Sequence, residues 1–324
     1  MTCLAAVSPL SLVGLARFFG QPPIVVVCYI LGVSILMIGL IVAFRRDIPR
    51  AQGLDKIVCL GPVFFAAPLA VFSGEHFTVT RGMAGMVPGW IPWHMFWVIF
   101  VGLCLLASAL SLAAGRVAGL ASFMLGVMFF GFVTLMDVEG LATRLHDRFM
   151  WTLTFRELTF SLCSFAFAAT RANDLWRPAA ERIAAIARVV VGGIIVFYGV
   201  EHFLHPQFVP VIPLELPLPA YIPVHALIAY IVGGAEVLAG LAMVVNRQAR
   251  TAATLLGALV GVVVVLVYLP LLIVHPADIG VAMNYVADTL CFGGAVLMLA
   301  ASIAPEQQER AAVARPVAVH IQSS

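Results

Sequence analysis

Charge is scarce in this sequence. Only 10% of its 324 residues are Asp, Glu, Lys or Arg, whereas 62% are hydrophobic, and soluble domains carry charge on roughly a quarter of their residues. So little charge cannot cover a water-exposed surface, which excludes an ordinary soluble protein. Together with a membrane location, the composition also excludes nucleic acid as a partner.

Paired cysteines are missing too. The six cysteines form no Cys-x-x-Cys pair, and five of them lie inside apolar runs, where a free cysteine is usually a small hydrophobic side chain. Thiol–disulfide chemistry is therefore not expected. Nor does any motif resemble a nucleotide-binding loop, a nucleophile triad or a redox dithiol.

Long apolar runs are abundant, and several approach the roughly 20 residues that a helix needs to cross a bilayer. We expect an all-α polytopic protein of the lipid bilayer. Nine spans are predicted, at about residues 22–44, 57–74, 91–113, 117–136, 151–170, 183–200, 222–245, 250–274 and 281–303.

Basic residues are distributed unevenly between the loops. The loops that share one side in a nine-span topology hold Arg45, Arg46, Arg50, Lys56, Arg116, Arg171, Arg177, Arg182, Arg247 and Arg250. The positive-inside rule makes that side cytoplasmic. This predicts an outside N-terminus and a cytoplasmic C-terminus, in what we expect to be a bacterial inner membrane.

A repeated motif divides the chain. Residues 73–77 read Ser-Gly-Glu-His-Phe and residues 199–203 read Gly-Val-Glu-His-Phe; Ile-Pro-Trp-His at 91–94 likewise matches Ile-Pro-Val-His at 222–225. The first pair is 126 residues apart and the second 131, so one short insertion separates two collinear copies.

The repeat predicts five regions. An N-terminal region with one span is expected at 1–56, a first four-helix unit at 57–170, a cytoplasmic linker at 171–182, a second four-helix unit at 183–303 and a cytoplasmic tail at 304–324. Because each unit has an even number of spans, both copies enter the membrane from the same side and form parallel repeats.

The second unit resembles the DoxX-like family of four-helix bacterial membrane proteins. The resemblance rests on Gly-Val-Glu-His-Phe at 199–203, the Pro-rich loop after it, Gly-Gly-Ala-Glu-Val-Leu-Ala-Gly at 233–240, and Asn284 with Asp288 in the final helix. It extends more faintly to residues 57–170. It implies a link to quinone-coupled oxidation and to membrane oxidoreductase complexes.

Polar residues inside the spans are the candidates for function, because an ionisable side chain in a bilayer is costly unless it is paired or lines a cavity. In the second unit we expect one polar pocket, with Glu236, His202 and Asp288 as its reactive groups and Glu201, His225 and Asn284 beside them.

The first unit repeats part of this set. It offers Glu75, His76, His94 and Glu157 as further binding residues. It has Leu105 where the second unit has Glu236, which favours the second unit as the competent site. Solvation at helix ends, headgroup contact and structural ion pairs are alternative roles for these polar residues.

A pocket of this kind suits a quinone, which needs an apolar slot and an acid or histidine that exchanges protons. We therefore expect a membrane component of a quinone-linked redox system with a redox partner protein. A small-solute or proton-coupled transporter, a non-catalytic membrane anchor, and a haem- or metal-binding protein are the alternatives; no metal ligand set is assigned.

Overall fold

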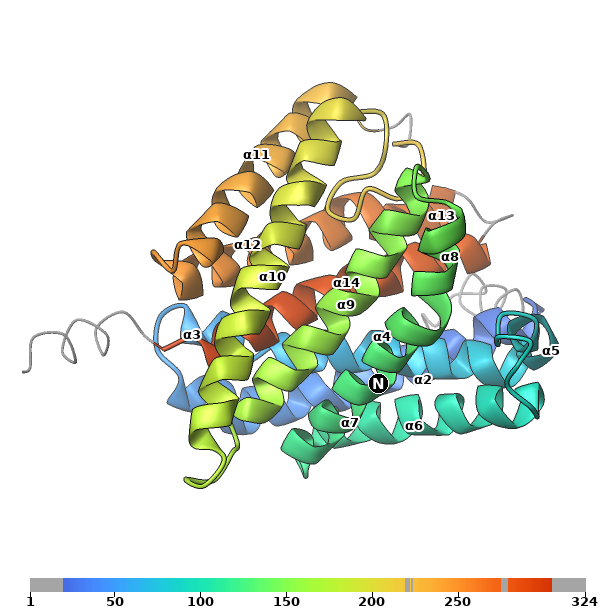
Figure 1. Ribbon diagram of the computed structural model, residues 1–324, viewed down its shortest axis with the longest axis horizontal. Helices are drawn as coiled ribbons and strands as arrows, with labels where there is room; N and C mark the ends of the chain where they lie inside the picture. The colour runs from blue at the N-terminus through green and yellow to red at the C-terminus, as the bar shows by residue number, and fades with distance from the viewer. Residues whose placement is uncertain (1–19, 219–221, 223, 275–278, 305–324) are drawn as a thin grey trace, which may run out of the picture.

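The computed structural model describes residues 20–218, 222, 224–274 and 279–304, and over these residues the protein is helical (Figure 1). The first 19 residues and the predicted tail beyond residue 304 lie outside them. The main helices are α2 (Pro23–Val42), α4 (Gly61–Thr78), α6 (His94–Ala114), α7 (Ala118–Phe132), α9 (Arg148–Ala169), α10 (Arg177–Leu204), α11 (His225–Val244), α12 (Ala249–Val263) and α14 (Ile279–Ser302). Short helices are α3 (Asp55–Val58), α5 (Thr80–Ala84), α8 (Val138–Thr143) and α13 (Leu269–Val274).

Eight of the helical segments are long and apolar enough to cross a membrane, which confirms an all-α polytopic membrane protein. The ninth predicted span is α9, which is 22 residues long but carries Arg148, Arg156 and Glu157. It packs against α7, α10 and α14, so its polar groups face protein. Within the described residues there is no strand, only one isolated bridge between Phe208 and Pro217.

Some helix ends differ from the predicted spans. Helix α4 continues to Thr78, so Glu75 and His76 lie within it and not beyond it. Helix α10 begins at Arg177 inside the predicted linker, because Pro178 at its first turn needs no hydrogen-bond partner for its nitrogen.

The repeat recurs in the helix boundaries. Helix α7 starts at Ala118 and α12 at Ala249, and α9 starts at Arg148 and α14 at Ile279, each pair 131 residues apart. The π-helical turns η3 (Val133–Asp137) and η4 (Val264–Tyr268) keep the same offset. The two units therefore fold alike down to their local irregularities.

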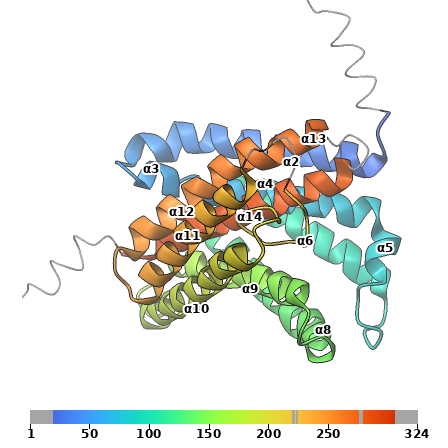
Figure 2. The same cartoon turned by 90° about the horizontal axis from the view of Figure 1, so that it is seen from above.

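The units interlock in a reciprocal way. The first helix of the first unit, α4, packs on the last helix of the second unit, α14; the first helix of the second unit, α10, packs on α9, the last of the first. Helices α9 and α14 also contact each other, and α14 passes through the middle of the molecule in both views (Figures 1 and 2). Polar residues on these four helices can thus meet across the unit boundary.

Within each unit the first two helices approach closely at matching positions. In the second unit a Cβ on Gly233 would lie 2.8 Å from the carbonyl oxygen of Gly199, so only glycine allows this contact. The equivalent pair in the first unit is Ser73 and Gly102, where the Ser73 hydroxyl donates to the Gly102 carbonyl at 2.8 Å. This approach places His76 against α6 and His202 against α11.

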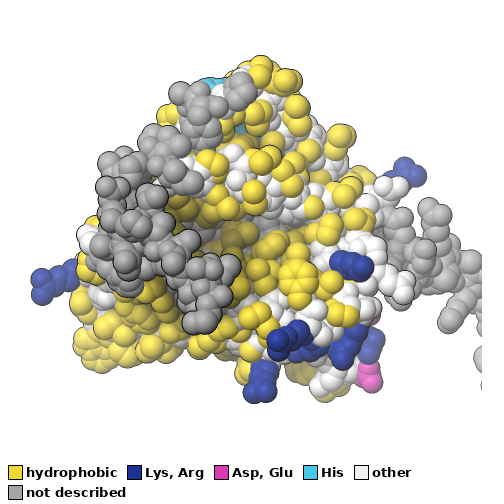
Figure 3. All heavy atoms as spheres, turned by 180° about the vertical axis from the view of Figure 1, so that it is seen from behind, with side chains coloured by type: hydrophobic (Ala, Val, Ile, Leu, Met, Phe, Trp, Pro, Cys, Tyr) yellow, Lys and Arg dark blue, Asp and Glu magenta, His cyan; other side chains and the backbone are white. Residues whose placement is uncertain are grey.

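The bundle has two chemically different ends. Helix α3 lies at one end and α5 at the other (Figure 1). The predicted cytoplasmic loops with their arginines lie at the α3 end, which we call the basic end. On the hydrophobic face seen in Figure 3, most of the visible Lys and Arg side chains gather toward one end. The Glu-His-Phe motif of the first unit lies toward the α5 end.

Candidate functional site

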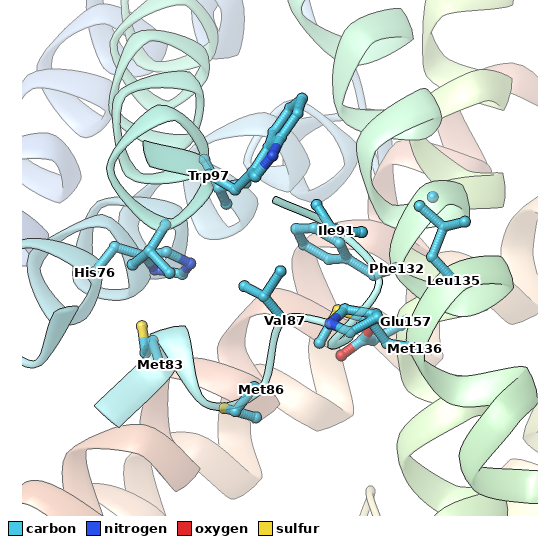
Figure 4. Close-up of a pocket in the computed structure, with 14 residues that line it drawn as sticks. His76, Met83, Met86, Val87, Ile91, Trp97, Phe132, Leu135, Met136 and Glu157 are labelled. Atoms are coloured by element: carbon cyan, nitrogen blue, oxygen red, sulfur yellow. The ribbon is translucent and has the colours of Figure 1, made fainter. Parts of the chain in front are cut away.

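An apolar pocket opens in the first unit at the α5 end, and we call it the first-unit pocket (Figure 4). Its volume is about 260 Å³. The walls come from α5 with the loop after it, from α6, and from α7 with η3. The apolar lining comprises Met83, Met86, Val87, Pro88, Ile91, Trp97, Val98, Val101, Phe132, Leu135 and Met136. Since pockets for drug-sized ligands run roughly 300–1,000 Å³, this one suits a smaller molecular group.

Two ionisable side chains reach the pocket, His76 from α4 and Glu157 from α9. Figure 4 shows them on opposite sides, with Val87 and Ile91 between. Nδ1 of His76 lies 2.8 Å from the Phe72 carbonyl oxygen. A carbonyl only accepts, so Nδ1 carries the proton and Nε2 of the neutral ring has a free lone pair.

Glu157 is connected to the other unit. Its Oε1 accepts from Arg156 at 3.3 Å, and the same guanidinium donates to Asp288 at 2.6 Å. The side chains of Glu157, Arg156 and Asp288 are 20%, 16% and 7% exposed, respectively. Because α9 and α14 pack against each other, Glu157 belongs both to the pocket and to a polar network at the boundary between the two units.

Two further carboxyl groups join this network. Glu75 is 9% exposed and lies within electrostatic reach of Arg156 and Asp288, and Asp137 lies beside Glu157. Four carboxyl groups therefore surround one guanidinium. If all were ionised, three negative charges would be left without compensation in a largely dry environment, which is costly.

The second unit is closed by its own chain where the first is open. Residues 205–218, which we call the second-unit loop, fold inward after α10, and Val209, Val211 and Ile212 are fully buried. The Val211 N–H donates to Nε2 of His202 at 3.0 Å. The Tyr268 hydroxyl donates to the Pro210 carbonyl at 2.7 Å.

His202 corresponds to His76, which lines the first-unit pocket. Tyr268 corresponds to Asp137, whose neighbour Met136 also lines that pocket. The second-unit loop therefore fills the space that corresponds to the first-unit pocket. In this conformation a ligand cannot reach His202, which is 0% exposed.

His202 and Glu236 do meet, as the predicted pocket requires. Nε2 of His202 lies 3.3 Å from Oε2 of Glu236, and both side chains are 0% exposed. Because Nε2 accepts from Val211, the proton of the neutral ring resides on Nδ1. None of the ion pairs between described residues brings a Lys or Arg to Glu236, so a charge on it would be uncompensated.

Glu201 lies apart from that pair. Its Oε2 is 3.4 Å from the guanidinium of Arg148 and 3.9 Å from the ring of His205. Arg148 also donates to the Pro213 carbonyl at 2.6 Å and to Glu215 at 3.3 Å. This arginine, from the start of α9, thereby holds the second-unit loop in place.

The remaining predicted site residues are peripheral. His94 and His225 are half-buried at the first positions of α6 and α11, and Asn284 is exposed although Asp288, one turn later, is buried. The single pocket expected in the second unit is thus divided: Glu236 and His202 lie under the loop, whereas Asp288 belongs to the Arg156 network.

Sequence reasoning missed two contributors. Tyr268 could have been found, because the 131-residue offset places it opposite Asp137. The clamp by Arg148 had no such signal, since the equivalent position in the second unit is Ile279. Its partners Pro213 and Glu215 lie in the second-unit loop, which is five residues longer than the equivalent connection in the first unit.

Among the described residues no group of three or more His, Cys, Asp and Glu is placed to hold a metal ion. What the first-unit pocket offers is an apolar slot with an acceptor nitrogen on one side and a carboxyl network on the other. No family model, curated protein or solved structure matches the chain. A proposal of function therefore depends on this geometry.

Proposed function

We propose that the first-unit pocket binds the headgroup of a membrane quinone, and that the chain is the membrane component of a quinone-linked redox system. One observation carries the proposal: His76 and Glu157 face the same apolar slot, and Glu157 continues into a buried carboxyl network. A quinone headgroup is flat and apolar, with two oxygens that exchange protons when electrons move.

His76 supplies one half of the recognition. Its Nδ1–H is held by the Phe72 carbonyl, so Nε2 accepts a hydrogen bond from a quinol hydroxyl. After taking the proton, the same nitrogen donates to the quinone carbonyl. The fixed Nδ1 contact keeps the ring orientation unchanged through both states.

Glu157 and its partners supply the second proton position. Oxidation of a quinol releases two protons and two electrons, and the cluster of four carboxyl groups around Arg156 has room for protons because full ionisation is unfavourable there. The two electrons pass to a partner protein that carries a redox centre. Asp288 extends the proton-holding network to the second unit, and Glu75 adds a further carboxyl group from α4.

The pocket end is proposed to face the outer compartment. The first-unit pocket lies at the end of α4 and α6 opposite the basic end, and the positive-inside rule assigns the basic end to the cytoplasm. A bacterial inner membrane, an outside N-terminus and membership in the DoxX-like family remain predictions that agree with this orientation.

Binding of a short-chain quinone to the purified protein in mild detergent tests the proposal. Decyl-ubiquinone should bind saturably, with quenching of the Trp97 fluorescence that a Trp97→Phe variant loses. His76→Leu should weaken binding about tenfold, because one hydrogen bond from a desolvated partner is lost.

The matched control is His202→Leu, the equivalent change in the second unit. It should leave the quinone affinity unchanged, since His202 is sealed under the second-unit loop. Equal weakening by both variants, or no saturable binding to the wild-type protein, would contradict the proposal.

A proton-coupled transporter is the second candidate. The buried network of Glu75, Arg156 and Asp288 at the boundary between two parallel repeats favours it, because transporters bind coupling ions at the interface between their repeats, and buried acids there can carry protons. Proton flux into proteoliposomes without any quinone or redox partner would favour transport over quinone chemistry.

A further inference from the structure

A second cavity lies at the basic end, remote from the first-unit pocket. It has a volume of about 210 Å³ and is formed where η1 (Ala43–Asp47), α4, the turn between α6 and α7, and the ends of α9 and α14 converge. Its charged lining residues are Arg46, Asp47 and Arg171, and the rest of its wall is largely apolar, including Val42, Val63 and Phe167. We call it the basic-end cavity.

Two glycines make room for the two arginines. A Cβ on Gly115 would collide with the guanidinium of Arg46, and one on Gly119 would lie 2.9 Å from Cδ of Arg171. Gly115 also has φ +63°, which favours glycine. The fold therefore brings both guanidinium groups to one cavity by leaving out neighbouring side chains.

Arg46 and Arg171 differ from other arginines at the basic end, whose N–H donors are used in hydrogen bonds to backbone carbonyls. Arg188 donates to the Met243 carbonyl, and Arg250 donates to the Ala300 and Ile303 carbonyls. Both of these cap the end of a helix, as basic residues commonly do.

Arg46 donates to both carboxylate oxygens of its neighbour Asp47, at 2.9 and 3.3 Å. Arg171 donates to the Thr170 hydroxyl and stacks over the Phe167 ring at 4.1 Å. A guanidinium has five N–H donors, so both groups have donors to spare for an anion.

The charge of the cavity is unbalanced. Two guanidinium groups face one carboxylate, which leaves a net positive charge. The pKa of Arg171 is lowered from its ordinary value, first by burial and second by the charge of Arg46, with Asp47 acting in the opposite direction. The two cations thus lie close enough to repel each other, and an anion between them would relieve the repulsion.

We propose that the basic-end cavity binds an anionic phospholipid, with its phosphate between Arg46 and Arg171 and the start of an acyl chain against Val42 and Val63. Guanidinium groups match phosphate oxygens in a bidentate geometry. The apolar wall distinguishes a lipid from a soluble anion, because free phosphate would gain nothing from it. Basic pockets between membrane helices are a known setting for anionic headgroups.

Native mass spectrometry of the delipidated full chain, titrated with phosphatidylglycerol or phosphatidylcholine, tests the assignment. Wild-type protein should retain phosphatidylglycerol in preference to phosphatidylcholine. The double variant Arg46→Gln/Arg171→Gln should bind phosphatidylglycerol about tenfold more weakly, because charge-assisted hydrogen bonds are lost. Ala301→Phe, which narrows the cavity and keeps both arginines, should also weaken it.

The matched control is Arg45→Gln/Arg177→Gln, which removes the same charge from positions at the same end that do not line the cavity and should bind like the wild type. Equal weakening by the control would reduce the effect to general surface charge and overturn the site. Displacement of the lipid by inorganic phosphate would overturn the lipid assignment, as would equal binding of phosphatidylcholine. Circular dichroism and elution volume verify that each variant is folded.

Discussion

The two four-helix units share their helix boundaries and their π-helical turns, yet they treat the space beside the Glu-His-Phe motif in opposite ways. In the first unit this space is an open apolar pocket of about 260 Å³ that contains His76. In the second unit it is filled by Val209–Ile212, and His202 has no exposure. Repetition of a fold therefore does not imply repetition of a site.

Loop length explains the difference. The connection after the motif is five residues longer in the second unit, since the offset grows from 126 at Glu75 and Glu201 to 131 at His94 and His225. The shorter connection forms α5 and stays at the rim. The longer one turns inward, and its Val211 adopts φ +83°, a conformation that is unusual for a β-branched residue.

The cations are distributed unequally as well. Arg148 and Arg156 both belong to α9, and the equivalent positions of α14 hold Ile279 and Ala287. One helix thus serves both units: Arg148 clamps the second-unit loop, and Arg156 organises the carboxyl network. The reciprocal packing makes this possible, because α9 contacts α10 and α14 directly.

Removing Arg156, the cation shared by both units, should have the largest effect on stability. Arg156→Leu leaves Glu157 and Asp288 without their guanidinium and should cost about 3–5 kcal/mol of stability, measured by unfolding in mixed micelles. Adding Asp288→Asn should recover part of this loss, because one carboxyl group of the excess is then neutral. Wild-type stability in Arg156→Leu would show that the network does not depend on charge pairing.

A matched pair of substitutions tests whether one unit is filled and the other open. Val211→Asp places a carboxylate at a fully buried position of the second-unit loop and should cost about 3 kcal/mol or more. Val87→Asp, at the half-buried wall of the first-unit pocket, should cost less than about 1 kcal/mol, because the charge can reach solvent. Similar losses in the two variants would contradict a filled second unit and an open first unit.

The smallest effect is expected where the second unit is made like the first. Glu236→Leu introduces the residue that the first unit has at Leu105, itself 2% exposed. It removes a buried acid that lacks a cation and should raise stability by about 1 kcal/mol. Quinone affinity should not change. A loss of quinone binding would return the site to the second unit and contradict the assignment to the first.

Much of the fold follows from local patterns in the sequence. The nine predicted helices are present, and the offset of 131 residues matches Ala118 with Ala249 and Arg148 with Ile279 as helix starts. These features depend on apolar run length and on short motifs, which act within a few residues of each other. Helix ends were less predictable: α4 runs on to Thr78, past the predicted end at residue 74.

The candidate site could be predicted only in part. The sequence singled out His76, Glu157, His202 and Glu236 by their cost in a membrane. It expected the last two in one pocket, and the structure brings these two side chains within 3.3 Å of each other. It placed Asp288 in the pocket with His202 and kept a structural ion pair with Arg156 as the alternative, and the structure joins Asp288 to Arg156. Nothing in the spacing of α14 reveals that its neighbour on that face is α9.

By itself, the sequence determined that this chain is an all-α membrane protein made of two similar halves, because hydrophobicity and repeat spacing are properties of the chain alone. Only the tertiary structure decided which half has an open pocket and which carboxyl groups share a guanidinium. Those outcomes depend on the path of one longer loop and on helix packing across the two units. Both arise from contacts between residues far apart in the chain, which no local pattern records.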